Sequence, residues 1–151
     1  MLGKQVEDFA LPSTDGATFR VAERRGRNLV LFFYPKDNTP GCTAEAAQFR
    51  DLHKEFARSG CEVCGISRDS IRSHAGFKAK LGLPFELLSD GDEAVCARFG
   101  VIRIKTMYGR KVRGIERSTF VIDREGVLAR EWRGVKVPDH AQEVLDFVKT
   151  L

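Results

Sequence analysis

The chain has few histidines, no second C-x-x-C motif and no long hydrophobic run, and each absence excludes a class of function. Its three histidines, His53, His74 and His140, have no metal-ligand spacing, so a zinc site is not expected. The longest apolar run, 29–34, is far too short to cross a bilayer. The first residues carry no signal-type apolar core, and we therefore expect a cytoplasmic protein that does not bind membranes.

The composition is that of an ordinary globular chain. Charged residues make up 30% and hydrophobic residues 42% of its 151 residues. A chain of this length buries roughly 70% of its unfolded surface without extra cross-links. No internal repeat or linker is visible, so we expect a single domain over 1–151. The four cysteines could form two disulfides, but in a reducing compartment a redox or catalytic use is favoured.

The formal net charge of +4 raises the question of nucleic-acid binding. Positive charge is concentrated late in the chain, at Arg103, Lys105, Arg110, Lys111, Arg113 and Arg117. Only Tyr108 is interleaved there as an aromatic side chain for base stacking, and no nucleic-acid motif is present. The pattern predicts a solvated basic loop, with weak attraction of anions as the alternative.

Hydrophobic periodicity predicts strands that alternate with helices. We expect an N-terminal β-arm at 3–19, strands at 28–34, 62–67, 85–89, 118–123 and 127–132, and helices at 40–59, 70–82, 93–99 and from 139 onward. Asp139 and Gln142 have the spacing of a capping pair, and the last helix has an apolar stripe from Ala141 to Leu151. This order predicts an α/β fold, with a central mixed β-sheet flanked by helices on both faces.

Cys42 is the strongest candidate for a reactive residue. Thr39 suits the N-cap and Pro40 the first position of the predicted helix 40–59, which puts Cys42 in the first turn. The positive end of a helix and its unpaired N–H groups favour the thiolate over the thiol. Cys42 also follows a strand directly, at the sheet edge where open α/β folds collect their chemistry. The sequence therefore predicts a nucleophilic cysteine.

Residues around Cys42 suggest how such a thiolate could be used. Thr39 offers a hydroxyl for a polar substrate oxygen, Pro35 could shield the site from water, and backbone N–H groups could meet developing negative charge. Arg117, at the entry to the strand 118–123, could supply a guanidinium. The physical properties of these residues alone do not bring Arg117 to Cys42.

Two further residues are left with alternatives. For Glu45, we favour an acid that complements the helix dipole over a polar contact within the site. Tyr34 is equally suited to lining a pocket and to the edge of the core.

Several segments resemble one protein family. The spacing Pro35-x-x-x-Thr39-x-x-Cys42 matches the peroxiredoxin active-site signature, and 114–120 resembles the segment that carries this family's active-site arginine, here Arg117. Four segments resemble the bacterioferritin comigratory protein, or peroxiredoxin Q, branch: 39–43, 65–67, 88–90 and 99–101. The resemblance extends over essentially the whole chain.

The resemblance implies a thioredoxin-like fold and reduction of hydrogen peroxide or organic hydroperoxides. Cys42 thiolate would attack a peroxide oxygen and become a sulfenic acid. Thr39 and the Cys42 amide would hold the peroxide, Arg117 would stabilise the thiolate and the breaking O–O bond, and Pro35 would exclude solvent. The resemblance implies no metal, haem or nucleotide cofactor. It implies a thiol reductant of thioredoxin, glutaredoxin or glutathione type, and a monomer.

The chain differs from its relatives in the thiol that would resolve Cys42. Relatives carry a resolving cysteine either five residues after the peroxidatic one or in the next helix. This chain has Ala47 at the first position and Lys78 at the position that aligns with the second. We therefore expect one-Cys behaviour, in which an external thiol reduces the sulfenic acid directly.

The remaining cysteines are weaker candidates. Cys61 and Cys64 enter a strand at its amino end, where three extended residues span about 10 Å, beyond the roughly 7 Å limit for a disulfide between Cα atoms. We expect both to be structural. Cys96 is the least excluded possible resolving cysteine, although a buried core thiol is favoured.

Other cysteine chemistry fits less well. A phosphatase loop needs five residues between cysteine and arginine, but seven separate Cys42 from Arg50. A cysteine hydrolase needs a histidine base, and we expect all three histidines to be exposed on helices. Two alternatives stay open: a thiol–disulfide oxidoreductase, which would need a second cysteine where Glu45 stands, and a non-enzymatic redox sensor or chaperone.

Overall fold

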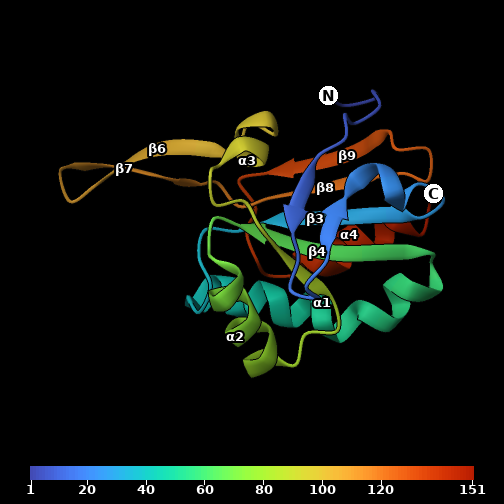
Figure 1. The fold of residues 1–151 in the computed structure, drawn as a ribbon, viewed down its shortest axis with the longest axis horizontal. Helices are drawn as coiled ribbons and strands as arrows, with labels where there is room; N and C mark the ends of the chain where they lie inside the picture. The colour runs from blue at the N-terminus through green and yellow to red at the C-terminus, as the bar shows by residue number, and fades with distance from the viewer.

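The computed structural model describes residues 1–151 and has a five-stranded mixed sheet at its centre (Figure 1). In spatial order the strands are β5 (Glu86–Ser89), β4 (Cys61–Ser67), β3 (Asn28–Phe33), β8 (Ser118–Ile122) and β9 (Leu128–Arg133). Strands β3, β4 and β5 are parallel, whereas β8 runs antiparallel to β3, and β9 antiparallel to β8. The mixed α/β architecture predicted from the sequence is confirmed.

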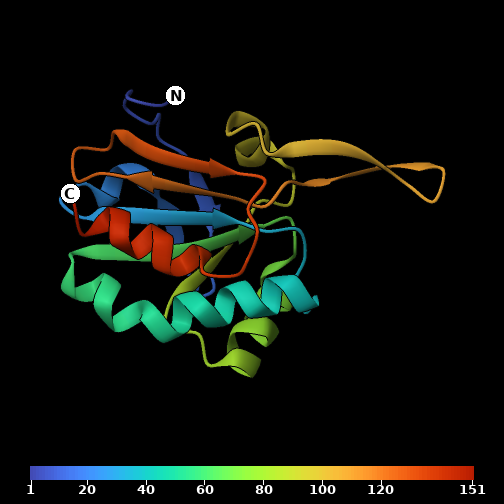
Figure 2. The same cartoon turned by 180° about the vertical axis from the view of Figure 1, so that it is seen from behind.

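Two layers cover the sheet (Figures 1 and 2). One face packs against α1 (Pro40–Arg58), α2 (Ile71–Leu81) and α4 (His140–Val148). The other face packs against α3 (Ala94–Arg98) and the N-terminal arm, which consists of β1 (Ala10–Pro12), β2 (Thr18–Arg20) and the 3₁₀ helix η1 (Val21–Arg24). None of the four α-helices combines the length and hydrophobicity needed to span a bilayer.

The central strand β3 explains why two separate cores form. All six of its residues are buried, and successive side chains point to opposite faces of the sheet. Leu31 and Phe33 join the core under the N-terminal arm, whereas Val30 and Phe32 join the core under α1 and α4. A strand buried on both faces has a continuous apolar sequence rather than an alternating one. The sheet therefore separates any two side chains that belong to different cores.

The basic segment is a hairpin rather than the predicted loop. Strands β6 (Ile102–Met107) and β7 (Arg110–Ile115) pair antiparallel and project from the body of the molecule (Figures 1 and 2). Tyr108 and Gly109 form the two-residue turn, both with positive φ, as a tight hairpin connection requires. Basic and apolar residues alternate at the start of β6, which is the pattern of a strand, so the prediction of a loop from the concentration of positive charge is wrong.

The start and end of α4 also differ from the prediction. Asp139 precedes the helix with a left-handed φ of 61° and makes no capping hydrogen bond. Gln142 instead donates from Nε2 to Oδ1 of Asp146, 2.9 Å away, so the predicted capping pair is wrong. Leu151 lies beyond the helix and is exposed. The rest of the stripe is buried as expected, at Ala141, Val144, Leu145 and Val148.

Gly65 in β4 allows the side chains of the neighbouring strands β3 and β5 to pack closely against it. An added Cβ would lie 2.8 Å from both Leu87 Cδ2 and Phe32 Cζ, and 3.1 Å from Tyr34 Cε1. These neighbours are buried and have little room to move. We expect Gly65→Ala to lower the free energy of unfolding by about 1–3 kcal/mol, as measured by urea denaturation.

Gly76→Ala in α2 is the matched control. No atom lies within 4 Å of the place that an added methyl group would take, and the φ of Gly76 is helical rather than positive. Alanine favours a helix over glycine by about 1 kcal/mol, so this variant should be neutral or slightly more stable. Equal stability losses in the two variants would contradict the packing explanation for Gly65.

Candidate active site

The turn between β3 and α1 positions Cys42. Asn38 adopts a left-handed φ of 64°, a conformation that asparagine tolerates better than most residues. Thr39 is then extended, and α1 begins at Pro40, so Cys42 is the third residue of the helix. Its side chain is only 1% exposed. The start of the helix and the position of Cys42 in it are as predicted.

Thr39 occupies the N-cap position, but its side chain does not cap the helix. Its Oγ1 donates to the carbonyl of Lys36, 2.7 Å away. The first amide with a backbone acceptor is that of Thr43, and no acceptor pairs with the amides of Gly41 and Cys42. The positive end of α1 therefore lies unneutralised beside the sulfur.

Arg117 joins Cys42 to Glu45. One guanidinium nitrogen, Nη2, lies 3.4 Å from Cys42 Sγ, while Nη1 donates to Glu45 Oε1 at 2.7 Å. The pairing of β3 with β8 explains the approach, because Ser118 lies opposite Phe33 and the residue before Ser118 reaches the edge where β3 ends. In the sequence, Arg117 is a candidate because it enters a strand, and only the family resemblance implies that it meets Cys42.

Two residues accommodate Arg117: Gly41 leaves room for its guanidinium, and Val135 binds its backbone carbonyl. A Cβ on Gly41 would lie 3.1 Å from Arg117 Nη2, so glycine permits the close approach. The amide of Val135 donates to the carbonyl of Arg117 at 2.9 Å.

Glu45 lies in the second turn of α1 and is buried, so the favoured prediction of a dipole-complementing acid is wrong. The alternative, a polar contact within the site, is what the structure has. Burial raises the pKa of Glu45 to about 7, although the charge of Arg117 and its hydrogen bond oppose that shift. Burial alone would lower the pKa of Arg117, but Glu45 and Cys42 together raise it. The guanidinium thus stays cationic between two groups that favour its charge.

Pro35 lies at the end of β3 and lines a charged groove of about 370 Å³. The other lining residues are Lys36, Arg68, Asp69, Gly91 and Glu93. Pro35 and Lys36 belong to the loop that leads to Cys42, whereas Cys42 itself does not line the groove. Pro35, Thr39, Cys42 and Arg117 therefore gather at one edge of the sheet.

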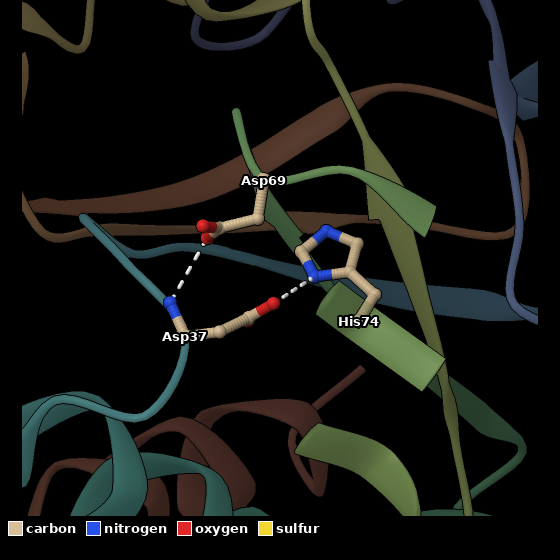
Figure 3. Close-up of side chains that lie close together, drawn as sticks. All are labelled: Asp37, Asp69 and His74. Carbon is tan, nitrogen blue, oxygen red and sulfur yellow. Dashed lines mark hydrogen bonds and ion pairs between the residues drawn. The ribbon is translucent and has the colours of Figure 1, made fainter. Parts of the chain in front are cut away.

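A buried hydrogen-bond network anchors the same loop from its other side (Figure 3). Asp37 accepts from the Tyr34 hydroxyl at 2.6 Å and lies 2.7 Å from Nδ1 of His74 in α2. The backbone amide of Asp37 donates to Asp69 at 2.9 Å. Tyr34 is buried in the core rather than lining a pocket, and burial together with the charge of Asp37 raises its pKa well above the ordinary value.

The contacts of His74 orient its ring between α2 and the loop before α1. Its Nε2 lies 2.9 Å from the Leu88 carbonyl, which can only accept, so this nitrogen carries a proton. Its Nδ1 lies 2.7 Å from the Asp37 carboxylate and 3.3 Å from the Tyr34 hydroxyl. Burial alone would raise the pKa of Asp37, but hydrogen bonds from His74 and Tyr34 and the charge of His74 lower it. Asp37 is thus held as a buried carboxylate in contact with the His74 ring.

Ligand atoms of Asp37, Asp69 and His74 lie within 4.8 Å of one another, a spacing that a metal ion could use. Each of them already takes part in a hydrogen bond within the chain. The cluster therefore fits a hydrogen-bonded anchor better than a metal centre.

The prediction that all three histidines are exposed is wrong. His74 and His140 are buried, and His53 is half-buried. His140 Nε2 lies 2.8 Å from the Thr119 hydroxyl, and burial lowers the pKa of its ring. None of the three forms a hydrogen bond with Cys42, so the histidine base of a cysteine hydrolase is missing.

The other cysteines are distant from Cys42 in the fold. Cys64 and Cys96 belong to the core under the N-terminal arm, across the sheet from Cys42. Cys61 shares a core with Cys42 but pairs with Asn28 at the start of β3, the opposite end of that strand. All four thiols are free.

Burial suppresses the ionisation of these three thiols. It raises the pKa of Cys61 to about 12, and it also raises the pKa of Cys64 and of Cys96 well above the ordinary value. Cys61 and Cys64 also point to opposite faces of β4 and cannot pair with each other.

We expect His74→Gln to destabilise the protein by about 3 kcal/mol, because it leaves the Asp37 charge buried without its partner. Ser73→Ala removes only a 2.8 Å hydrogen bond to Asp37 and should cost about 1 kcal/mol. Denaturation with urea at several pH values measures both.

The two variants should also differ in pH dependence. The pKa of Asp37 is lowered in the folded state, so its contribution is complete above the unfolded value of about 3.9 and is lost as the pH falls through the folded value. The difference in unfolding free energy between wild type and His74→Gln should therefore shrink below about pH 4. A difference independent of pH would contradict the ion pair.

Comparison with known proteins identifies the family. The model of the AhpC/TSA family matches residues 2–131. The chain is 49% identical to peroxiredoxin Bcp of Xanthomonas campestris over 142 residues, covering 94% of this chain and 89% of that protein. It is 45% identical to peroxiredoxin Bcp of Bacillus subtilis over 150 residues, covering 99% and 96%.

Solved structures agree with this assignment. A structure of Xylella fastidiosa PrxQ superposes with a TM-score of 0.94 at 42% identity, covering 99% of this chain and 96% of that chain. A structure of the X. campestris bacterioferritin comigratory protein gives 0.90 at 47% identity, covering 94% and 90%. The thioredoxin-like fold is thereby confirmed. The chain belongs to the AhpC/TSA family, in its Bcp or peroxiredoxin Q branch, and is a peroxiredoxin that uses a thiol to reduce peroxides.

Proposed function

We propose that Cys42 is the peroxidatic nucleophile and that Arg117 is the residue that stabilises its reaction. The single observation that carries this proposal is the guanidinium bridge, with Nη2 3.4 Å from Cys42 Sγ and Nη1 2.7 Å from Glu45 Oε1. The bridge orients one N–H of Arg117 toward the sulfur and keeps it there. A fixed cation beside the sulfur favours the thiolate, the form that attacks.

The thiolate sulfur attacks one oxygen of the hydroperoxide, forming an S–O bond while the O–O bond breaks. Cys42 becomes a sulfenic acid, and the second oxygen leaves with the bonding electron pair, takes up a proton and becomes water or an alcohol. Negative charge thus moves from sulfur to the leaving oxygen. Arg117 and the free amides of Gly41 and Cys42 are placed to stabilise that charge.

Thr39 is proposed to orient the substrate. Because its hydroxyl proton is donated to Lys36, Oγ1 has lone pairs available to accept from the O–H of a hydroperoxide. Pro35, beside the groove at the end of β3, is proposed to limit the access of water. These assignments give each residue of the signature a separate task.

We propose hydrogen peroxide and organic hydroperoxides as substrates. The X. campestris relative is described as reducing alkyl peroxides, which supports an organic substrate for this chain as well.

The reductant is proposed to be an external thiol of thioredoxin, glutaredoxin or glutathione type, making this a one-Cys enzyme. Two observations support this: Cys64 and Cys96 lie across the sheet from Cys42, and burial raises the pKa of every other thiol in the chain. A thiol that stays protonated is a poor nucleophile toward a sulfenic acid.

We also propose that the enzyme acts as a monomer in the cytoplasm. One chain supplies all the residues of the proposed site. Four free thiols suit a reducing compartment.

Substitutions at Cys42 and Arg117 test the mechanism. We expect Cys42→Ser to abolish peroxide consumption with dithiothreitol as reductant. Arg117→Lys keeps a charge but cannot bridge Cys42 and Glu45 with two nitrogens. It should lower the second-order rate constant for peroxide by about 10²- to 10³-fold in stopped-flow measurements.

Arg72→Lys, at an exposed position of α2, is the matched control and should keep the wild-type rate constant. Normal turnover by Cys42→Ser would disprove the proposed nucleophile. A wild-type rate in Arg117→Lys would remove Arg117 from the mechanism.

A disulfide map tests the one-Cys proposal. After one equivalent of peroxide, we expect mass spectrometry of non-reduced peptides to find Cys42 as a sulfenic acid that dimedone traps, with no intrachain disulfide. Cys96→Ser should keep wild-type turnover with dithiothreitol. A Cys42–Cys96 disulfide in the monomer would overturn the proposal.

A further inference from the structure

The hairpin β6–β7 exposes apolar side chains that no part of the chain covers. Ile104 is 68% exposed, Met107 50%, Tyr108 100% and Val112 44%. These are four of the seven large hydrophobic residues that the whole chain leaves exposed. They lie on both faces and at the tip of an arm that stands clear of the body (Figures 1 and 2). Clustered exposure of this kind is typical of an interaction surface.

The same hairpin carries positive charge only. Between Ile102 and Ile115 there are five basic residues and no acidic one. Arg103 and Arg113, near the base, form ion pairs with Glu116 and Glu93. The three cations of the outer part have no such partner: Lys105, Arg110 and Lys111. The outer hairpin therefore complements a partner with an acidic surface and an apolar patch.

The base of the hairpin is continuous with the proposed active site. Strand β7 ends two residues before Arg117, and Glu93, which binds Arg113, also lines the groove beside Pro35. Figure 2 shows the hairpin extending from the end of the molecule at which α1 begins. Six extended residues reach about 20 Å, comparable to the width of a small domain. A protein in contact with the Cys42 loop could therefore also contact the hairpin.

We propose that the hairpin is a docking arm for an acidic protein dithiol, which delivers the electrons that return oxidised Cys42 to its thiolate. The inference rests on the proposed function of Cys42. One thiolate of the donor attacks the Cys42 sulfenic sulfur, which forms a mixed disulfide and releases hydroxide, protonated to water. The donor's second thiolate then attacks the donor sulfur of that disulfide. The donor leaves as a disulfide, and Cys42 is a thiolate again.

Other occupants fit the surface less well. A second copy of this chain would bring the same five cations to the interface and be repelled. A lipid surface that took up the tip at Met107 and Tyr108 would leave the active site about 20 Å away along the hairpin. A protein donor is the occupant that uses both the hairpin and the adjoining groove.

Charge reversal on the outer hairpin tests the proposal. The variant carries Lys105→Glu, Arg110→Glu and Lys111→Glu, and three rates are measured: oxidation by peroxide, turnover with dithiothreitol, and turnover with an acidic thioredoxin and its reductase. We expect kcat/KM for thioredoxin to fall at least tenfold and to lose most of its salt dependence. The other two rates should stay at wild-type values.

A control variant separates local from net charge. Lys54→Glu, Arg58→Glu and Lys80→Glu change the net charge equally at exposed helical positions, and this variant should keep wild-type kinetics. A second hairpin variant, Met107→Ser with Tyr108→Ser, should raise KM for thioredoxin several-fold without changing the salt dependence. Circular dichroism checks that each variant is folded.

Four results would overturn the docking proposal. These are unchanged thioredoxin kinetics in the hairpin charge variant, an equal loss in the control variant, and a wild type that accepts electrons from dithiothreitol but not from thioredoxin. The fourth is binding of the wild type to phosphatidylglycerol vesicles that the charge variant loses while it keeps its thioredoxin kinetics. Failure of the proposed function itself gives a different result, because dithiothreitol would then support no Cys42-dependent turnover.

Discussion

The ion pair between Arg117 and Glu45 is the interaction on which the proposed site depends. A guanidinium that Glu45 holds at 2.7 Å has its second nitrogen free to face Cys42 Sγ at 3.4 Å. Holding the long, flexible Arg117 side chain beside the sulfur costs conformational entropy, and the ion pair with Glu45 offsets that cost. Without the guanidinium, the buried Glu45 carboxylate would have no cation between it and a sulfur that becomes an anion in the proposed mechanism. The proposed thiolate chemistry of Cys42 therefore needs both Arg117 and Glu45.

The rest of the fold holds this unit from two sides. The antiparallel register of β3 and β8 brings Arg117 to the edge of the sheet, and the Val135 amide fixes its carbonyl. From the other side, the buried pair of Asp37 and His74 ties the loop before α1 to α2. Buried ion pairs add little net stability, but they strongly disfavour arrangements in which either charge is left alone. The network thus restricts the loop to one conformation, which preorganises the start of α1.

Local signals explain what the sequence could predict. The Thr39-Pro40 pair marks a helix start within a few residues, so the position of Cys42 in the first turn followed without a structure. Arg117 is 75 residues away from Cys42, and its contact depends on a strand pairing that hydrophobic periodicity does not define.

Burial of polar groups was the main source of wrong expectations. Glu45 and His74 were expected at the surface because polar residues on helices are usually exposed. Each is instead buried against a partner from another part of the chain. Their burial is stable only because Arg117 and Asp37 approach from other parts of the chain. The sheet also sets Cys42 apart from Cys64 and Cys96 and leaves it without a neighbouring thiol. This separation supports the one-Cys proposal, in which the reducing thiol belongs to another molecule, and the uncovered basic hairpin at the same edge is the docking surface that we propose for it.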